Sequence, residues 1–388
     1  MQFGIDLLIW FALFAGLGRA LLAFLPPGRV GSHRLADLPE TLFVSSMLGV
    51  WVQLVPLPLL YTELVPLSPV VSIVALALVA IGVIVRVLLL PQALVPQHEL
   101  PRPRWGGLES ALALTFAVAI LWPDESFGDL QAWSVFERAM KAVLLVTAAS
   151  HVTRAVECAG RPTWLGLLVA LTTLTPQSPL GCRGETLQLQ IQFVTLGIAT
   201  SLAGWLRRAD SRDRALALFG SGALVGIDVR LAVAGLLATL LFTHSNALKS
   251  TLRAALLSLA FVAVPTVWAV SDGMSMIYAP DSELTFYGVP VNPLLPLGVV
   301  TVIVVASLAL GQSATSPQPT ARFAGRGREV GAIATLCALP PLFAAFALAV
   351  PELDAPELAP LSLAALGKIV APAAAFLAAI TLFPQRKA

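Results

Sequence analysis

The feature that most constrains this chain is its long succession of apolar runs, each close in length to a helix that crosses a bilayer. A membrane helix needs about 17–25 mostly apolar residues, because every backbone amide must be hydrogen-bonded inside the hydrocarbon. Twelve runs approach that length, at residues 3–25, 42–60, 70–90, 107–122, 139–156, 163–175, 187–206, 215–243, 252–270, 291–310, 330–350 and 363–383. The pattern predicts an all-α polytopic integral membrane protein with about 11–13 transmembrane helices.

Composition excludes several other classes of protein. The chain is 57% hydrophobic and only 12% charged, whereas soluble domains carry about 25% charged residues. A formal net charge of +2 provides no field to hold nucleic acid, so membrane lipids are the partners that composition predicts. The three cysteines, Cys158, Cys182 and Cys337, are widely separated and form no CxxC motif, which predicts neither a zinc site nor a disulfide framework.

The loops between the apolar runs alternate in charge. Short basic loops stay in the cytoplasm, and acidic residues weigh little in this rule. The alternation therefore predicts a protein of the bacterial inner (cytoplasmic) membrane, with its amino end outside and its carboxyl end in the cytoplasm. The basic loops contain Arg29, Arg34, Arg102, Arg104, Arg154, Arg161, Arg207, Arg208, Arg212, Arg214, Lys249, Arg253, Arg322, Arg326, Arg328, Arg386 and Lys387.

The run 215–243 breaks this alternation, because both of its flanks are basic. A hairpin of two short helices, 215–227 and 231–243, would keep both flanks on one side and meet near Asp228 and Arg230. Each half would be roughly 20 Å long, short of the roughly 30 Å hydrocarbon core. The alternative is one long tilted helix in which the same two charged residues pair inside the bundle.

Two elements on the predicted outer side combine polar and apolar residues. After Gln131, apolar side chains including Trp133 recur at helical spacing, which predicts either a helix along the membrane interface or an ordinary packing helix. Further on, the alternation QLQIQ fits a helix better than a lone strand in hydrocarbon. On that helix Glu185, Gln188, Gln192 and Thr195 form one polar stripe. The stripe predicts either interhelical hydrogen bonds or a substrate cavity.

Charged residues within the apolar runs need partners or access to the interface. A charge near mid-bilayer costs about 2.5–3.5 kcal/mol on insertion scales. Asp228 and Arg230 lie close enough in sequence to neutralise each other. Lys368 lies only a few residues into its run, so we expect its side chain to extend to the interface.

Four segments resemble motifs of bacterial GT-C-type membrane glycosyltransferases. The stretch QAWSVFERAMKAV, which begins at Gln131, resembles their D-A-W-x-x-W-x-x-K-A-K motif, and LTPQSPLGCRGETLQL resembles L-P-x-x-x-x-G-Y-A-D-x-P-L. The segment ALFGSGALVGIDVRLAVAGLL resembles their G-L-x-x-L-T-K-N-E-G hairpin, and PELAPLSLAALGKIVAP resembles their closing L-D-R-L-L-L-Q-L-A-P helix. Together these segments extend over residues 108–383.

The resemblance implies a many-spanning GT-C-like core over residues 107–388, preceded by a three-helix membrane segment over residues 1–106. Active members of the family move a sugar from a polyprenyl phosphate carrier to an acceptor on the outer face. Their first outer loop supplies a carboxylate as base or metal ligand, as this chemistry requires.

The chain departs from the family pattern at its carboxylates. Gln131 stands where the first Asp is expected, and an amide can neither take the proton nor bind a divalent ion strongly. Gly184 replaces the second Asp, Asp228 and Val229 replace the N-E pair, and Ala365 replaces the Arg of the closing helix. The substitutions predict a scaffold without transferase activity or cofactor, which acts as a structural or assembly subunit beside other integral membrane subunits.

Two other functions stay open at the level of sequence. An active transferase would use Asp129, Glu185 and Asp228 as catalytic carboxylates, with Mg²⁺ or another divalent ion. Arg183 or Arg230 would then bind the polyprenyl phosphate. Gln131, Trp133 and Gln188 would line the same site. A transporter would explain broken helices with intramembrane charge, although the two halves of the chain show no inverted repeat.

Overall fold

The described part of the chain is almost entirely helical. A computed structural model describes residues 18, 40–47, 106–121, 132–175, 178–181, 186–208, 210–225, 227–243, 245–271, 285–286, 289–290, 292, 294–313, 321–350 and 361–383. The helices are α5 (Gly107–Leu121), α6 (Ala132–Cys158), α7 (Thr163–Thr173), α8 (Thr186–Arg208), α9 (Ser211–Leu224), α10 (Val229–Leu241), α11 (Ser245–Ser271), α12 (Leu295–Ser313), α13 (Ala321–Ala349) and α14 (Leu363–Thr381). Residues 40–47 form a further helical segment. The strands β1 (Thr285–Phe286) and β2 (Val289–Pro290) pair antiparallel.

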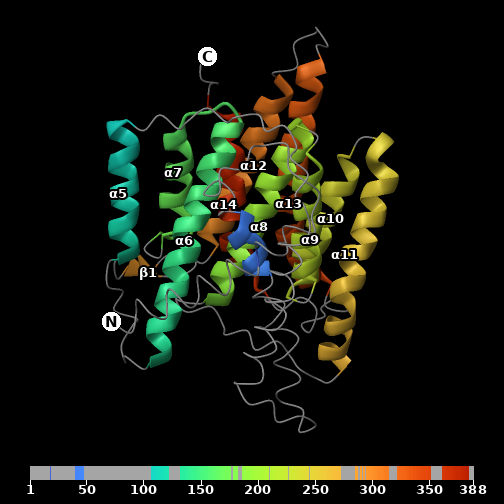
Figure 1. The fold of residues 1–388 in the computed structure, drawn as a ribbon, viewed down its shortest axis with the longest axis horizontal. Coiled ribbons are helices and arrows are strands. Elements are labelled where there is room, and N and C mark those ends of the chain that lie inside the picture. Colours follow the sequence, from blue (N-terminus) through green and yellow to red (C-terminus); the bar gives the residue numbers. More distant parts are fainter. Residues whose placement is uncertain are drawn as a thin grey trace, which may run out of the picture.

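The helices stand side by side in one bundle, with α5 and α11 at its two flanks (Figure 1). Helix α14 lies in the interior, where it packs against α7, α8, α12 and α13. Most of its side chains are buried from Ala364 to Ile380. This central position agrees with its composition, because a helix that is apolar all round is stable only where every face is covered.

Among the described residues, three helices are long and apolar enough to cross a membrane. They contain the candidate spans Gln188–Arg207 in α8, Gly327–Ala349 in α13 and Leu363–Thr381 in α14. This result supports the predicted helical membrane protein, whereas the number of 11–13 crossings stays a prediction. The runs 3–25, 42–60 and 70–90 lie almost wholly outside the described residues, as does the predicted segment 1–106.

Contacts between distant residues define two ends of the bundle. At one end Arg161 Nη2 donates to the carbonyl of Ile380 at the close of α14, and Arg207 pairs with Glu329 near the start of α13. We call this the arginine end; it lies at the top of Figure 1. At the other end, which we call the hairpin end, the turn between α9 and α10 contacts residue Leu361, just before α14.

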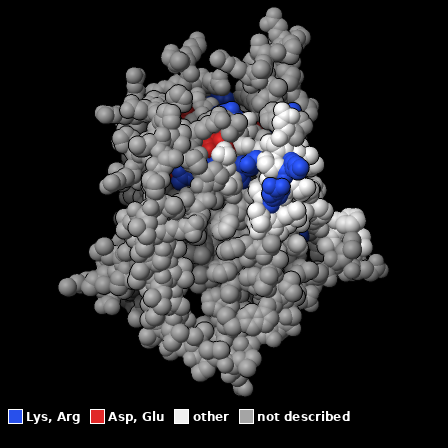
Figure 2. All heavy atoms as spheres, turned by 45° about the vertical axis from the view of Figure 1, so that its right-hand side comes forward, with Lys and Arg blue, Asp and Glu red and all other residues white. Residues whose placement is uncertain are grey.

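The basic helix termini gather at the arginine end. On the face shown in Figure 2, most of the described Lys and Arg side chains lie in the upper half. The starts of α9 and α11 meet there through hydrogen bonds from Arg214 to Ser250 and Thr251. The loop charges predict this grouping, and the compartment that faces the arginine end remains a prediction.

The hairpin predicted for residues 215–243 is present. Helix α9 has 14 residues and α10 has 13, and Asp228 precedes the first residue of α10. The two helices run antiparallel in close contact, because a Cβ on Gly235 of α10 would overlap the Ser221 hydroxyl of α9. The single long helix is therefore wrong, although its proposed pairing of Asp228 with Arg230 occurs at the turn.

The predicted interface helix after Gln131 is wrong as a separate element. Helix α6 runs without a break for 27 residues, from Ala132 to Cys158. The segment contains neither Gly nor Pro, and these are the residues that most often end or kink a helix. The first turns of α6 therefore continue directly into the predicted span.

The segment 40–47 is wedged between α6, α8 and α9. Its Phe43 is fully buried and stacks on His151 of α6, with ring centroids 6.1 Å apart and 8° between the planes. On the α8 side the same ring occupies the position that a Cβ on Gly197 would take. The segment 40–47 can therefore pack in this position only with glycine at residue 197.

The contact between α6 and α7 generates a test of the packing. A Cβ on Gly166 of α7 would overlap Thr153 Cα, a backbone atom of α6 that no side-chain rotation can move. We expect Gly166→Ala to lower the free energy of unfolding by about 1–3 kcal/mol through overpacking. Thermal unfolding of the purified protein in detergent measures the change.

Gly298→Ala is the matched control for this test. A Cβ on Gly298 of α12 has nothing within 4 Å, so alanine should be neutral or should stabilise the helix by up to about 1 kcal/mol. Equal losses of stability in the two variants would contradict the packing described for α6 and α7.

Candidate functional site

The hairpin turn holds the charged pair that the sequence singles out. Asp228 is 0% exposed and Arg230 Nη2 lies 2.7 Å from its Oδ2. Arg230 Nε also donates to Oδ1 at 3.1 Å, which makes the pair bidentate. Charge-assisted bidentate pairs are among the strongest hydrogen bonds in proteins, and they tolerate burial because both charges are compensated.

The same carboxylate also organises the backbone around it. Asp228 Oδ1 accepts from the Arg230 amide and so caps the N-terminus of α10, as Asp commonly does. Its Oδ2 accepts from the Leu361 amide at 3.3 Å, while Arg230 Nη2 donates to the Leu361 carbonyl. The pair therefore fastens the hairpin turn to the start of α14. Each carboxylate oxygen already accepts two hydrogen bonds.

The structure describes only some of the other site residues that the sequence predicts. Asp129, Gln131, Arg183 and Glu185 lie outside the described residues. Trp133 belongs to the first turn of α6, of which the structure describes the backbone. The structure thus gives no geometry that joins these five residues to Asp228.

One member of the polar stripe on α8, Gln192, forms hydrogen bonds between helices. Gln188, Gln192 and Thr195 are buried within the bundle. Gln192 Nε2 donates to the carbonyl of Thr173 at 3.2 Å and to that of Lys368 at 3.1 Å. The side chain joins α8 to the end of α7 and to α14, and it satisfies a carbonyl that the short helix α7 leaves inside the bundle.

Lys368 lies a few residues into α14, and its extension to the interface stays a prediction. It is 6% exposed in the interior helix α14. Helix α14 packs against four neighbouring helices, and Lys368 lies in its first turns, at the hairpin end.

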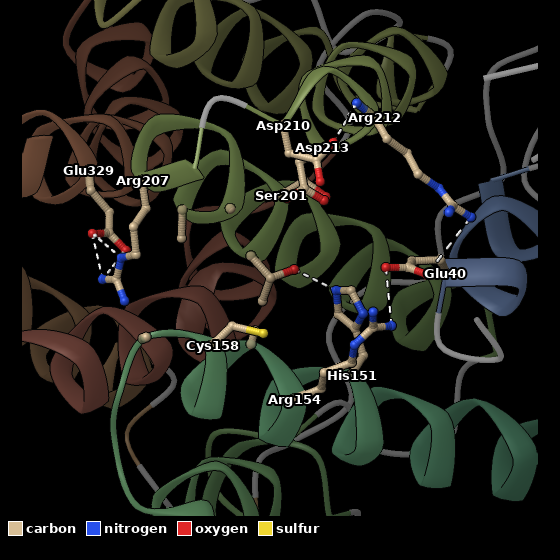
Figure 3. Close-up of a pocket in the computed structure, with 15 residues that line it drawn as sticks. Glu40, His151, Arg154, Cys158, Ser201, Arg207, Asp210, Arg212, Asp213 and Glu329 are labelled. Atoms are coloured by element: carbon tan, nitrogen blue, oxygen red, sulfur yellow. Dashed lines mark hydrogen bonds and ion pairs between the residues drawn. The ribbon is translucent and has the colours of Figure 1, made fainter. Parts of the chain in front are cut away.

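A charged cavity at the arginine end was not predicted from the sequence. Its volume is about 50 Å³, enough for a few water molecules. It lies between the segment 40–47 and helices α6, α8, α9 and α13, and Figure 3 shows its side chains. The cavity is lined by Glu40, His151, Arg154, Ala155, Cys158, Ala159, Thr200, Ser201, Ala203, Gly204, Arg207, Asp210, Arg212, Asp213 and Glu329.

Ion pairs across this cavity join five segments of the bundle. Arg207 of α8 holds both oxygens of Glu329 of α13, with the shortest N–O distance at 2.6 Å. Glu40 lies 3.2 Å from Arg154 of α6 and 3.9 Å from Arg212 of α9 (Figure 3). Acids and bases are nearly balanced around the cavity, so the arrangement favours cross-linking of helix ends over the capture of a charged ligand.

Two buried atoms of this network lack hydrogen-bond partners among the described residues. They are Glu40 Oε2 and Arg212 Nε. Both belong to the lining of the cavity, so water molecules there would satisfy them. From the sequence alone, these charged residues indicate only on which side of the membrane each loop lies. No spacing in the sequence indicates that Glu40 meets α6 and α9.

The described residues offer no metal centre and the chain has no matching relative in the comparisons made. No group of three or more His, Cys, Asp or Glu in the described part of the chain is arranged to hold a metal ion. Comparison with protein-family models, with curated proteins and with solved structures gave no match. The resemblance to GT-C glycosyltransferases thus rests on the sequence motifs alone.

The buried pair at the hairpin turn generates a second prediction. Asparagine can still cap α10, so Asp228→Asn removes the charge and leaves the Arg230 guanidinium buried without its counterion. We expect a loss of about 3 kcal/mol in the free energy of unfolding. Urea or thermal unfolding in detergent measures it.

A double variant separates pairing from general disruption. In Asp228→Asn with Arg230→Gln no charge is left uncompensated, so the combined loss should be smaller than the sum of the two single losses. Simple additivity would show that the two side chains do not depend on each other.

The shared carboxylate at the arginine end generates a third prediction. Glu40→Gln removes the counterion of Arg154 and Arg212 and should lower the free energy of unfolding by about 2 kcal/mol. Glu109→Gln is the control, because Glu109 lies at an exposed helix start and accepts one backbone hydrogen bond. That control should change stability by at most about 0.5 kcal/mol. Equal effects of the two substitutions would contradict the role given to Glu40.

Proposed function

We propose that this chain is a GT-C-like membrane scaffold that has lost sugar transfer and acts as a structural or assembly subunit of a membrane complex. The observation that carries the proposal is the state of Asp228, the described member of the three candidate catalytic carboxylates. Arg230 and the start of α14 occupy both of its oxygens.

The chemistry of transfer explains why this matters. A general base needs a carboxylate oxygen within reach of the acceptor hydroxyl, and a metal ligand needs a free lone pair. Asp228 is fully buried and neutralised by Arg230. Its contacts are those of a residue that holds the hairpin turn in place. The substitutions at Gln131 and Gly184 remove carboxylates at the two other positions where the family motifs have them.

The outer surface of the bundle suits a subunit surrounded by lipid and by other helices. Large apolar side chains are exposed on α12 and α13, among them Val302 at 69% and Leu348 at 73%. Such faces need an apolar environment, which lipid chains or neighbouring transmembrane helices provide.

An active transferase is the second candidate, and one feature of the bundle favours it. The turn with Asp228 and the start of α8 lie at the same end of the molecule, because Gln192 of α8 and Asp228 both contact the first turns of α14 or the residue before them. Glu185 directly precedes α8 in the sequence, and an active transferase would use it at this end. Asp129 would complete a site with Mg²⁺ and a polyprenyl phosphate donor.

Sugar transfer distinguishes the two candidates. Purified protein in detergent with polyprenyl-phosphate sugars and Mg²⁺ should show no transfer above that of a heat-inactivated sample. Transfer that disappears in Asp129→Asn or Glu185→Gln, while the folded protein is recovered in equal yield, would refute the scaffold proposal.

Purification from native membranes tests the subunit role directly. In mild detergent the chain should elute with other integral membrane proteins in a fixed stoichiometry that survives a second, orthogonal separation. A homogeneous single-chain particle with bound polyprenyl lipid would favour the transferase.

The proposed orientation places the arginine end in the cytoplasm. In a cysteine-free background, Lys249→Cys in exposed α11 and Asn292→Cys before α12 provide one label at each end. A membrane-impermeant maleimide added to intact cells should label residue 292 and leave residue 249 unlabelled until the membrane is opened. Labelling of both residues from the same side would contradict the orientation.

A further inference from the structure

The first turns of helix α11 carry two cations whose charge no described residue compensates. Lys249 and Arg253 are both exposed, and within the described ranges neither forms an ion pair. Residues four apart in a helix lie one turn apart on the same face, so the two side chains are neighbours. Helix α11 contains no Asp or Glu over its 27 residues, and nothing on this helix offsets the two charges.

The packing of α11 on α9 determines which way these cations point. Thr251, Ala255 and Ser258 follow at helical spacing and are buried, the most exposed of them at 8%. Ser258 Oγ donates to the Leu218 carbonyl of α9 at 2.8 Å. At 3.6 residues per turn, the cations at residues 249 and 253 lie on the opposite side of α11 from this buried face. They therefore point away from the bundle.

The charged residues at the start of α9 do not neutralise this face. Asp210 and Asp213 both line the cavity at the arginine end (Figure 3). Arg214, which lies closest to α11, donates from Nη1 to Ser250 Oγ at 2.8 Å. The described contact between α9 and α11 at this end thus adds a further cation and no acid.

Apolar side chains continue the same face toward the middle of α11. Leu256 is 59% exposed and Leu257 is 66% exposed. With a rise of 1.5 Å per residue, they lie about 5 Å beyond Arg253 along the helix axis. The outward face of α11 is therefore cationic near the arginine end and apolar directly beyond it.

From this face we infer that the first half of α11 binds an anionic phospholipid. Lys249 and Arg253 pair with the phosphate, and an acyl chain of the same molecule lies along Leu256 and Leu257. A soluble anion would use the cations and leave the leucines uncovered. A zwitterionic lipid brings its own cation, so an excess of positive charge on the protein favours a lipid with net negative charge. The inference goes beyond the proposed function and holds whether or not the chain transfers sugar.

Native mass spectrometry of the full chain in mild detergent tests the lipid site. Phosphatidylglycerol titrated into the wild type should give a saturable one-lipid adduct, and phosphatidylcholine at the same concentrations should give a weaker one. In the double variant Lys249→Gln with Arg253→Gln, the affinity for phosphatidylglycerol should fall at least about tenfold, because both charges that attract the phosphate are lost.

Matched variants separate this site from net charge. Exchange of the two cations, Lys249→Arg with Arg253→Lys, should preserve binding. Arg253→Gln alone should weaken it, whereas Lys141→Gln, which removes one cation from α6, should leave it unchanged. If the double variant is not recovered folded, Arg253→Gln and Lys249→Gln as single variants provide the same test.

Competition with inorganic phosphate tests whether the site is built for a lipid. Phosphate in large excess over phosphatidylglycerol, compared with chloride at equal ionic strength, should not displace the lipid, because phosphate cannot cover the leucines. Displacement by phosphate would overturn the assignment to a lipid.

Two other outcomes would also overturn the inference. One is a double variant that binds phosphatidylglycerol as tightly as the wild type. The other is an equal loss of affinity in Arg253→Gln and Lys141→Gln, which would show that the lipid responds to the net charge of the protein and not to the face of α11.

Discussion

The bundle depends on compensation of charge and of backbone groups where its short helices end in buried surroundings. Helices α9 and α10 are each shorter than a bilayer crossing, and Asp228 at their turn is fully buried. The turn is stable there because Asp228 neutralises Arg230, caps α10 and receives the Leu361 amide. Gln192 performs a similar task at the end of α7, where it satisfies the Thr173 carbonyl. A few polar side chains thus permit half-length helices in an otherwise apolar core.

The two ends of the bundle use charge differently. At the arginine end, acids and bases from five segments meet around a small cavity, and the pairs formed by Glu40 and Glu329 join helices that are distant in sequence. At the hairpin end the described charges are fewer and more deeply buried. There Asp228 and Arg230 neutralise each other, and Lys368 forms no ion pair with a described residue.

The helical architecture could be predicted because hydrocarbon leaves the backbone few alternatives. The hairpin followed from two basic flanks around one apolar run, and the helical nature of QLQIQ followed from the exclusion of a lone strand. The continuity of α6 was missed because amphipathic spacing around Trp133 suggested a surface helix, while the lack of any helix-breaking residue decided the outcome.

The candidate site could be predicted only in part. Asp228 and Arg230 were identified as charges that need each other, yet their tie to Leu361 joins residues 131 positions or more apart and leaves no local pattern. The cavity around Glu40 was not predicted either, because its residues also form no local pattern. Their charges were already explained by the rule for membrane topology. Burial and partnership, which distinguish a structural carboxylate from a catalytic one, are properties of the assembled bundle.

The buried position of Phe43 has a consequence for biosynthesis. The surfaces that enclose this ring come from His151, Phe193, Gly197 and Gly220, all of which leave the ribosome long after the segment 40–47. The early segment cannot reach its final place until some 220 residues have been made, of which Gly220 is the last of these contacts. Docking of the segment 40–47 therefore follows the synthesis of α9 and cannot accompany the insertion of the first helices.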